Sequence, residues 1–309
     1  MKIIAVDTGN RYVKTPNFHF TAGLAELGQT EPILKVDNIK YKGNFYALTE
    51  TRTGYIKDKT KNNNYYILSL FGIAKELELA EPERKNFDED INLVIGLPPS
   101  HISLLKEKFK EYFMQDEGNV SFVYNEKHFN IVIKDIQVLP QGYPAALKYV
   151  GKYKDYPTSY IIDIGGYTTD VFVLNKGMPD LNLCESVDMG VIQMCNEVKT
   201  AVNREIGAEI GDIEIEETLR GNNSLPPAFR KKIVEIASRY VSELANKLYE
   251  KKINFKLFPA VFVGGGSGLF ENFLKEEASS ESAFETDVSA NAKGYAIFGE
   301  KIYGNKKKK

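Results

Sequence analysis

The chain has 309 residues, of which 43% are hydrophobic and 27% charged, as is usual for a globular protein with a substantial core. Its 40 basic and 42 acidic residues leave a net charge of −2, which gives no electrostatic reason to expect direct DNA binding. Cys184 and Cys195 are too few for a disulfide framework, and the apolar runs fall far short of the roughly 20 residues of a membrane helix. We therefore expect a cytoplasmic protein with no membrane segment.

The first half of the sequence predicts buried strands, a helix and a hairpin. Residues 2–6 (KIIAV) and 91–97 (INLVIGL) are short, apolar and β-branched, as buried strands are. Two prolines end the second run, and apolar residues then recur at helical spacing up to residue 113. The segment 119–139 is interpreted as a hairpin and strand, followed by a helix entry at 139–150. The stretch 31–90 has the least regular pattern, and we expect a small subdomain there with no chemistry of its own.

The second half repeats the alternation of strands and helices. Residues 160–164 (YIIDI) predict a buried strand, and 171–187 a hairpin that turns near residues 175–179. Helical periodicity follows over 190–206 and 226–250, and 254–277 is typical of a strand, a glycine-rich turn and a helix. A last helix is expected over 290–304. Alternating strands and helices predict the α/β class.

Two segments about half the chain apart are similar. IIAVDTGN (3–10) and YIIDIGG (160–166) are both apolar strands that end in Asp-x-Gly. Asp7 aligns with Asp163 and Gly9 with Gly165. This pattern is expected of two related halves that each begin with a similar strand and turn.

Three glycine-rich turns are candidate phosphate sites: DTGNRYVK (7–14), DIGGYTTD (163–170) and VGGGSGLF (263–270). Glycine lets the backbone turn its N–H groups into a concavity that can bind phosphate. The aspartates have the wrong sign for phosphate itself, but they suit a Mg²⁺ ion between carboxylate and phosphate. For any one of these turns, the alternative is a plain β-turn.

Other site classes fit the sequence less well. The P-loop pattern G-x-x-x-x-G-K-[ST] is absent, and Leu269 stands where a Rossmann turn needs its third glycine. The same turn also lacks the last glycine of a nucleophile elbow. The histidines at 19, 101 and 128 have no zinc-like partners at ligand spacing.

The order of these turns identifies a resemblance that spans nearly the whole chain. The matching stretches are DTGNRYVK (7–14), VIGLPPS (94–100), LPQGYPAAL (139–147), DIGGYTTD (163–170), GVIQMCNEV (190–198), VFVGGGSGLF (261–270) and ANAKGY (290–295). Together they resemble the actin/Hsp70/sugar-kinase superfamily of ATPases, and within it the ParM/StbA group of plasmid-segregation actins.

The resemblance implies a role for each matching residue in binding ATP, or GTP, with Mg²⁺. The first phosphate loop is implied to contain Asp7, Gly9, Asn10 and Lys14. The second is implied to contain Gly165, Gly166, Thr168 and Thr169. The turn near adenosine is implied to contain Gly264, Gly265, Gly266 and Ser267. Asp7, Asp163 and Asp170 are implied to hold Mg²⁺ through water.

Gln141 is implied to position the attacking water, which makes Gln141, Asp7 and Asp163 the expected catalytic residues. Glutamine orients water but is a poor base, so slow hydrolysis is expected. Arg204 and Glu205 are either base or ribose contacts or part of a solvated helix face.

The resemblance also implies an architecture and a function. The expected architecture is an actin-like fold of two related α/β domains that clamp the nucleotide. These are residues 1–145, with the small subdomain at about 31–90, and 146–289; a C-terminal helix at 290–309 returns to the first domain. The implied function is assembly into head-to-tail ATP-dependent filaments that segregate plasmid DNA and turn over as ATP is hydrolysed. A ParR-like adaptor contacts the DNA, so the filament protein does so only indirectly.

Two alternatives remain open on the same fold. One is an ATPase that acts as a regulator or scaffold without polymerising. The other is a small-molecule kinase, for which the sequence offers no clear catalytic carboxylate. The four lysines at 306–309 are interpreted as a solvated terminus.

Overall fold

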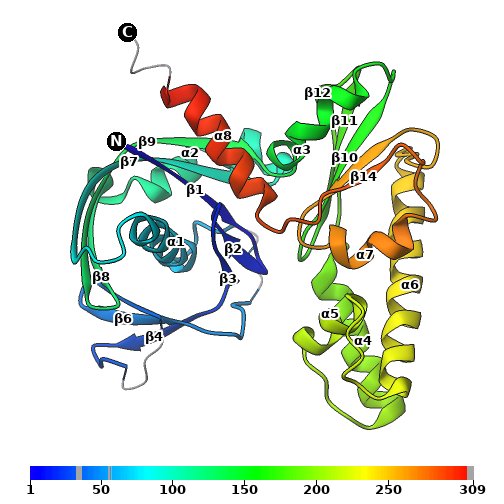
Figure 1. The fold of residues 1–309 in the computed structure, drawn as a ribbon, viewed down its shortest axis with the longest axis horizontal. Coiled ribbons are helices and arrows are strands. Elements are labelled where there is room, and N and C mark those ends of the chain that lie inside the picture. Colours follow the sequence, from blue (N-terminus) through cyan, green and yellow to red (C-terminus); the bar gives the residue numbers. More distant parts are fainter. Residues whose placement is uncertain (33–36, 55, 57, 305–309) are drawn as a thin grey trace. The chain divides into compact units, whose positions relative to one another are not determined.

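The computed structural model describes residues 1–309 except 33–36, 55, 57 and 305–309 (Figure 1). The lysine run at 306–309 therefore lies outside the described residues. The chain forms two compact units. The first unit comprises Met1–Pro144 and Val288–Lys309, and the second unit comprises Ala145–Asp287. Both combine a sheet with helices, which confirms the α/β class.

The first unit is built on a nine-stranded sheet with the order β3-β2-β1-β7-β9-β8-β5-β6-β4. Its strands are β1 (Lys2–Thr8), β2 (Tyr12–Lys14), β3 (His19–Thr21), β4 (Leu24–Gly28), β5 (Asn38–Tyr41), β6 (Asn44–Leu48), β7 (Asn86–Leu97), β8 (Asn119–Tyr124) and β9 (Lys127–Pro140). The neighbours β1, β7 and β9 are parallel, and the other pairs are antiparallel. The sheet curls around helix α1 (Asn64–Ala80) (Figure 1).

Strand β1 carries apolar side chains on both of its faces. Ile4 and Val6 belong to the core that contains α1, and Ala5 packs with Tyr295 of α8 (Ala290–Gly304). Alternate side chains of a strand point to opposite faces, so a continuous apolar run is what a strand covered on both sides requires. Helix α2 (Pro99–Phe113) adds Phe109 to the α1 core, and a 3-10 turn (Gln115–Gly118) follows it.

The stretch 31–90, whose sequence pattern is the least regular, contains helix α1 over residues 64–80. All residues from Tyr65 to Ala74 of α1 are buried. A helix that is buried all round has no polar face and therefore no amphipathic period in its sequence. Strands β5 and β6 of the same stretch are part of the nine-stranded sheet.

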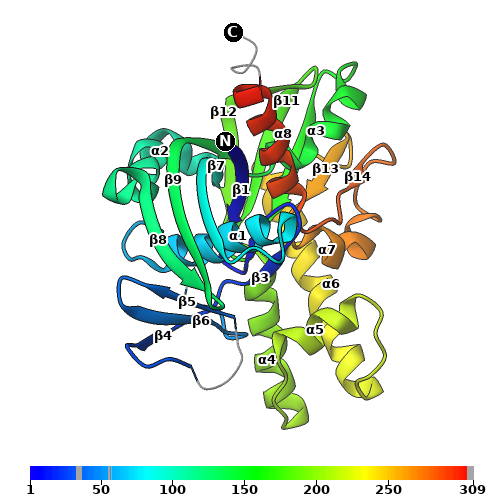
Figure 2. The ribbon, with the colours of Figure 1, turned by 60° about the vertical axis from the view of Figure 1, so that its left-hand side comes forward.

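The second unit has a five-stranded sheet with the order β12-β11-β10-β13-β14. Its strands are β10 (Ser159–Ile164), β11 (Thr169–Asn175), β12 (Met178–Val187), β13 (Ala260–Val263) and β14 (Ala283–Phe284). Its helices are α4 (Val191–Ile206), α5 (Asp212–Leu219), α6 (Pro227–Glu250) and α7 (Ser267–Leu274); α3 (Tyr143–Val150) and a 3-10 turn (Gly151–Tyr153) precede the sheet. Ile162 and Ile164 of β10 share a core with α4, α6 and α7. Helices α4 and α6 pack against each other, as Figure 2 shows.

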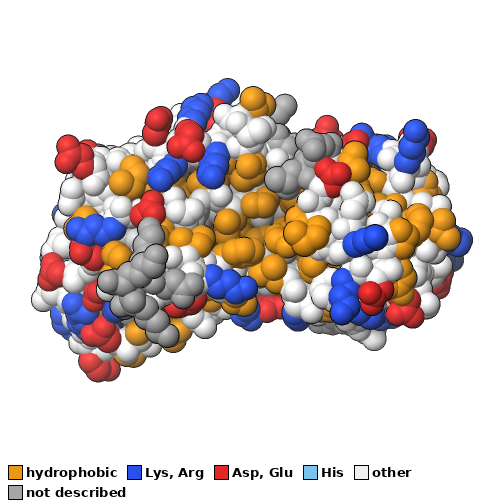
Figure 3. Space-filling model, turned by 90° about the horizontal axis from the view of Figure 1, so that it is seen from above, with side chains coloured by type: hydrophobic (Ala, Val, Ile, Leu, Met, Phe, Trp, Pro, Cys, Tyr) orange, Lys and Arg blue, Asp and Glu red, His pale blue; other side chains and the backbone are white. Residues whose placement is uncertain are grey.

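The surface in Figure 3 carries basic and acidic side chains interspersed with hydrophobic ones. Over the described part of the chain, no helix combines the length and hydrophobicity needed to cross a bilayer.

Candidate functional site

The first glycine turn joins β1 to β2 and brings Asp7 opposite Lys14. The two are register partners in the β1–β2 hairpin, so their side chains leave the same face of the ribbon. Lys14 Nζ lies 3.2 Å from Asp7 Oδ2, and both side chains are buried. At Gly9, a Cβ would lie 2.6 Å from the Tyr12 carbonyl oxygen. Asp7 and Lys14, seven residues apart, thus face each other across a tight hairpin whose turn requires glycine at position 9.

Gln141 reaches the same carboxylate from the end of β9. Because β1, β7 and β9 are parallel neighbours, their carboxyl ends meet at one edge of the sheet. The backbone N–H of Gln141 donates to the Leu97 carbonyl at the end of β7 (2.8 Å). Its side-chain Nε2 donates to Asp7 Oδ1 at 2.7 Å. Asp7 therefore holds Lys14 with one carboxylate oxygen and Gln141 with the other.

Two further residues contact this turn, and the sequence analysis missed both. Tyr65 of α1 donates its hydroxyl to Asn10 Oδ1 at 2.7 Å. The ammonium group of Lys59 donates to the Thr8 carbonyl, and the Lys59 side chain is buried. Both belong to the stretch in which the sequence predicted no chemistry. No local pattern marks them, because their contacts span 55 and 51 positions of the chain.

The second glycine turn joins β10 to β11 and places two aspartates side by side. Asp163 and Asp170 are register partners across the β10–β11 pair, and both are buried. The Gly165 N–H donates to the Thr168 carbonyl at 2.8 Å, which closes the turn. Thr168 Oγ1 donates to Asp170 Oδ2 at 3.0 Å, and Thr169 Oγ1 donates to the Met189 carbonyl at 2.7 Å. Backbone and hydroxyl groups thus fix the shape of this turn.

The N-terminus of α4 is hydrogen-bonded to the second turn. The N–H groups of Val191 and Ile192 donate to the carbonyls of Gly165 (3.1 Å) and Gly166 (2.8 Å). A Cβ on Gly190 would lie 2.4 Å from the Gly166 carbonyl oxygen, so only glycine allows this approach. N–H groups that would otherwise have no partner at a helix start are therefore bonded to the turn.

Gln193 and Tyr240 complete this support. Gln193 Nε2 donates to the Tyr167 carbonyl at 2.7 Å, and its Oε1 accepts from the Gly190 N–H at 3.2 Å. Tyr240 of α6 donates its hydroxyl to the Gly190 carbonyl at 2.9 Å. Burial raises the pKa of Tyr240 well above its ordinary value, so the hydroxyl stays protonated as a donor. Helices α4 and α6 are thereby linked to the turn.

The third glycine turn follows β13, which is the parallel neighbour of β10. Gly264 has φ = +87°, and a Cβ there would lie 2.1 Å from Asp163 Oδ1. Gly266 is similarly tight, since its Cβ would lie 2.3 Å from Ile164 Cγ2, whereas a Cβ on Gly265 would meet open space. Ser267 is fully buried, and its hydroxyl donates to the Phe262 carbonyl at 3.0 Å. The second and third turns are thus in contact through Asp163 and Gly264.

The two aspartates of the second turn suit a hydrated Mg²⁺ ion. Mg²⁺ is commonly held by one or two carboxylates together with several waters and substrate oxygens. Asp163 and Asp170 supply two buried carboxylates that lie opposite each other across the β10–β11 pair. Within the described ranges, three or more His, Cys, Asp or Glu side chains do not gather as a metal-binding group. The donor set therefore fits a water-mediated ion.

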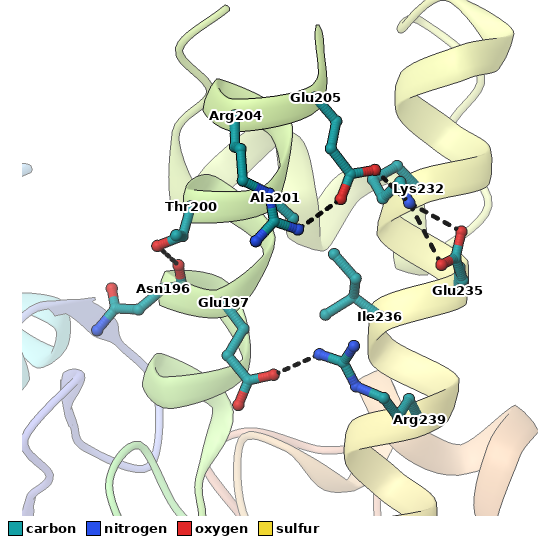
Figure 4. Close-up of a pocket in the computed structure, with 10 residues that line it drawn as sticks. All are labelled: Asn196, Glu197, Thr200, Ala201, Arg204, Glu205, Lys232, Glu235, Ile236 and Arg239. Carbon is teal, nitrogen blue, oxygen red and sulfur yellow. Dashed lines mark hydrogen bonds and ion pairs between the residues drawn. The ribbon is translucent and has the colours of Figure 1, made fainter. Parts of the chain in front are cut away.

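A separate groove of about 370 Å³ lies between α4 and α6 (Figure 4). Arg204 and Glu205 line it, and they pair with each other at 2.7 Å, while Lys232 lies 2.6 Å from Glu205. Arg239 pairs with Glu197 at 2.8 Å. Arg204 is 13 residues from the start of α4, which is about 20 Å along the helix. The structure thus places Arg204 and Glu205 in an ion-pair network far along α4 from the second turn.

Two family models match the sequence in succession. The model "Actin like proteins N terminal domain" matches residues 5–143, and "Archaeal actin homologue MreB-like, C-terminal" matches residues 161–276. No curated protein sequence matches the chain.

Solved structures share the fold over almost the whole chain. The apo psk41 ParM protein superposes with a TM-score of 0.70 and 16% identity, covering 98% of each chain. Ta0583, an archaeal actin homologue in complex with ADP, gives 0.71 and 17% over 97% of this chain and 100% of that one. The Alp12 filament structure gives 0.65 and 14% over 97% and 98%. At such identities the likeness shows a shared fold, which is the predicted actin-like fold.

Proposed function

Because the chain is an actin-like protein that resembles the ParM group, we propose that it is an ATPase that assembles into nucleotide-dependent filaments and segregates plasmid DNA. The observation that carries the ATPase part is the convergence of Lys14 and Gln141 on Asp7. It joins the ammonium group of Lys14, the amide of Gln141 and the carboxylate of Asp7 in one partly buried hydrogen-bonded group.

Each residue of this group has a distinct task in the proposed hydrolysis. Lys14 supplies a positive charge to phosphate oxygens, which strengthens a hydrogen bond relative to a neutral donor. Gln141 gives its Nε2 to Asp7, which leaves its amide oxygen to accept a hydrogen bond from water and orient it. Neither Gln141 nor Asp7 needs to change protonation for this. Hydrolysis driven by positioning alone is slow, as suits a protein that switches between states.

The second and third turns supply the remaining nucleotide contacts in this proposal. Backbone N–H groups and hydroxyls of the second turn, from Gly165 to Thr169, bind phosphate, and the third turn approaches adenosine. Asp163 and Asp170 would hold the waters of Mg²⁺. The ion, when bound, neutralises charge on the phosphates. ATP is the proposed nucleotide, and GTP is the alternative.

Support for self-assembly comes from the proteins that share this fold. One neighbour is described as the Alp12 filament, and another as a non-polymerisable mutant of pCBH ParM. A head-to-tail contact that does not close gives a helical filament. In the proposed cytoplasmic system, a ParR-like adaptor links filament ends to DNA, since a net charge of −2 gives this chain little attraction to DNA itself.

The test is light scattering and pelleting of the purified chain with Mg²⁺-ATP, Mg²⁺-GTP, Mg²⁺-ADP or no nucleotide, alongside phosphate release. We expect scattering that rises with the triphosphate and decays as phosphate appears. Asp7→Asn, which removes the shared carboxylate charge, is expected to lower phosphate release at least about 100-fold. Phosphate release without scattering would favour a non-polymerising ATPase. Neither signal from folded protein would overturn the nucleotide-site assignment.

A further inference from the structure

The segment Asp58–Thr60, between β6 and α1, carries a buried lysine that contacts the first turn. Lys59 is 6% exposed, and its ammonium group donates to the carbonyl of Thr8, between Asp7 and Gly9. Its Nζ also lies 5.0 Å from the ring centroid of Tyr65, a cation–π distance. The positive charge of Lys59 is therefore already at the turn that holds Asp7 and Lys14.

The residues on either side of Lys59 fix the segment from outside. Asp58 Oδ1 accepts hydrogen bonds from the Thr60 N–H (3.0 Å) and hydroxyl (2.6 Å). Asp58 Oδ2 lies 2.5 Å from Nζ of Lys108 on α2. Adjacent residues in an extended or turn segment point in different directions, so anchoring Asp58 to α2 leaves Lys59 facing the turn. The lysine is therefore held in place by an aspartate that pairs with another helix.

The chemistry of the turn favours an anion over the neutral carbonyl of Thr8 as an acceptor for Lys59. Burying an ammonium group is costly, and a hydrogen bond to an ionised acceptor is roughly twice as strong as one to a neutral carbonyl. Lys14 and Lys59 bring two cations to a turn whose own acidic residue is Asp7. Thr8 also holds a hydroxyl that is fully buried and has no hydrogen-bond partner among the described residues. A polyphosphate would supply both the charge and the acceptor oxygens.

We propose that Lys59 is a second phosphate-binding lysine of the first turn, which moves its hydrogen bond from the Thr8 carbonyl to a phosphate oxygen of the nucleotide. Tyr65 contacts both parts, since its hydroxyl donates to Asn10 of the turn and its ring lies beside the Lys59 ammonium group. This inference rests on the proposed nucleotide function and adds to it a residue from a segment with no glycine-turn motif. Lys59 and Lys14 then reach the phosphates from different segments of the first unit.

The test is calorimetric titration of the full chain with Mg²⁺-ATP, Mg²⁺-ADP and adenosine. The variants are Lys59→Gln, Lys59→Met and the control Lys61→Gln, whose lysine is exposed two residues further along. For both Lys59 variants, we expect the Kd for ATP and ADP to rise about 10- to 100-fold, the range for losing a hydrogen bond to a charged group. Adenosine affinity should not change, and Lys61→Gln should behave as wild type.

The outcomes separate this inference from the function on which it rests. If wild type binds ATP and the Lys59 variants bind it as Lys61→Gln does, Lys59 does not bind phosphate. Equal weakening for ATP and adenosine would show a structural role and also overturn the inference. If folded wild type binds no nucleotide, the proposed function fails first. Lys59→Met keeps the apolar stem against Tyr65, and urea unfolding without nucleotide checks that each variant folds.

Discussion

The two phosphate-type turns begin with the same Asp-x-Gly sequence but are held in different ways. In the first turn, Lys14, Gln141 and Lys59 come from separate segments of the first unit and bond to Asp7 or Thr8. The second turn is bonded through its own backbone and hydroxyl groups, the N–H groups at the start of α4 and the side-chain amide of Gln193. The first turn therefore gathers charged side chains, and the second is shaped mainly by close backbone packing.

The same Asp-x-Gly motif therefore serves two different requirements, nucleotide binding and stable folding. Charged side chains can exchange a protein partner for a ligand, so substitutions around the first turn should act mainly on nucleotide binding. Close backbone packing offers no such exchange, so substitutions around the second turn should act mainly on folding. Three substitutions test this distinction.

The largest effect is expected at Gly264, beneath the second turn. Gly264→Ala places a Cβ 2.1 Å from Asp163 Oδ1 and 2.7 Å from the Ile164 carbonyl oxygen, at a φ of +87°. We expect the free energy of unfolding to fall by about 3 kcal/mol or more, since the left-handed strain and the overlap add. Urea unfolding of the full chain measures the loss.

Gly265→Ala is the matched control, one residue along. A Cβ at Gly265 has no neighbouring atom within 4 Å, so unfolding should change by no more than about 0.5 kcal/mol. Similar stability for the two variants would show that the second turn tolerates movement, and the contrast with the first turn would disappear.

The elements around both turns could be predicted from the sequence, because each depends on a local pattern. The apolar runs at 2–6 and 160–164 fall within β1 and β10, and the hairpin over 171–187 is β11 and β12. Strand β7 begins at Asn86 rather than at the predicted residue 91. Its polar first residues pair with β9, and a pairing partner is not visible in the local sequence.

The contacts that assemble the first turn could not be predicted in the same way. The family resemblance implies that Gln141 positions water, whereas its hydrogen bond to Asp7 spans 134 positions of the chain. Tyr65 lies in α1 and Lys59 shortly before it, and the fully buried run 65–74 of α1 gives no helical period that would reveal the helix. Tertiary packing brings these residues together, and neither the spacing of residues in the sequence nor its composition predicts these contacts.

Gln193 is expected to give an intermediate effect on the second turn. Gln193→Ala removes the donor to the Tyr167 carbonyl and the acceptor for the Gly190 N–H. We expect a loss of about 1–2 kcal/mol in the free energy of unfolding, the cost of two hydrogen bonds between neutral groups. The measurement is urea unfolding with and without Mg²⁺-ATP.

Two further variants sharpen this result. Gln193→Glu keeps the acceptor for Gly190 but turns a carboxylate oxygen toward the Tyr167 carbonyl, so it should not restore stability. Asn196→Ala changes an exposed residue on the same helix and should have no effect. Full stability in Gln193→Ala would mean that the α4 backbone alone supports the turn.

The smallest effect is expected at the Asp58–Lys108 pair, the outer support of Lys59. The hydrogen bond from Lys108, followed by those from Thr60, lowers the pKa of Asp58 from its ordinary 3.8 to about 2. A carboxyl group whose pKa is lower in the folded state stabilises the fold above its unfolded pKa. That contribution is lost as the pH falls from about 4 to about 2.

Lys108→Gln should therefore lower the free energy of unfolding by about 0.5 kcal/mol at pH 7, since Lys108 is half exposed. The difference from wild type should shrink below pH 4, whereas Lys106→Gln, on the exposed side of α2, should match wild type throughout. If instead Lys108→Gln destabilises the chain as much as Gln193→Ala does, the first turn depends on its surroundings for folding as strongly as the second.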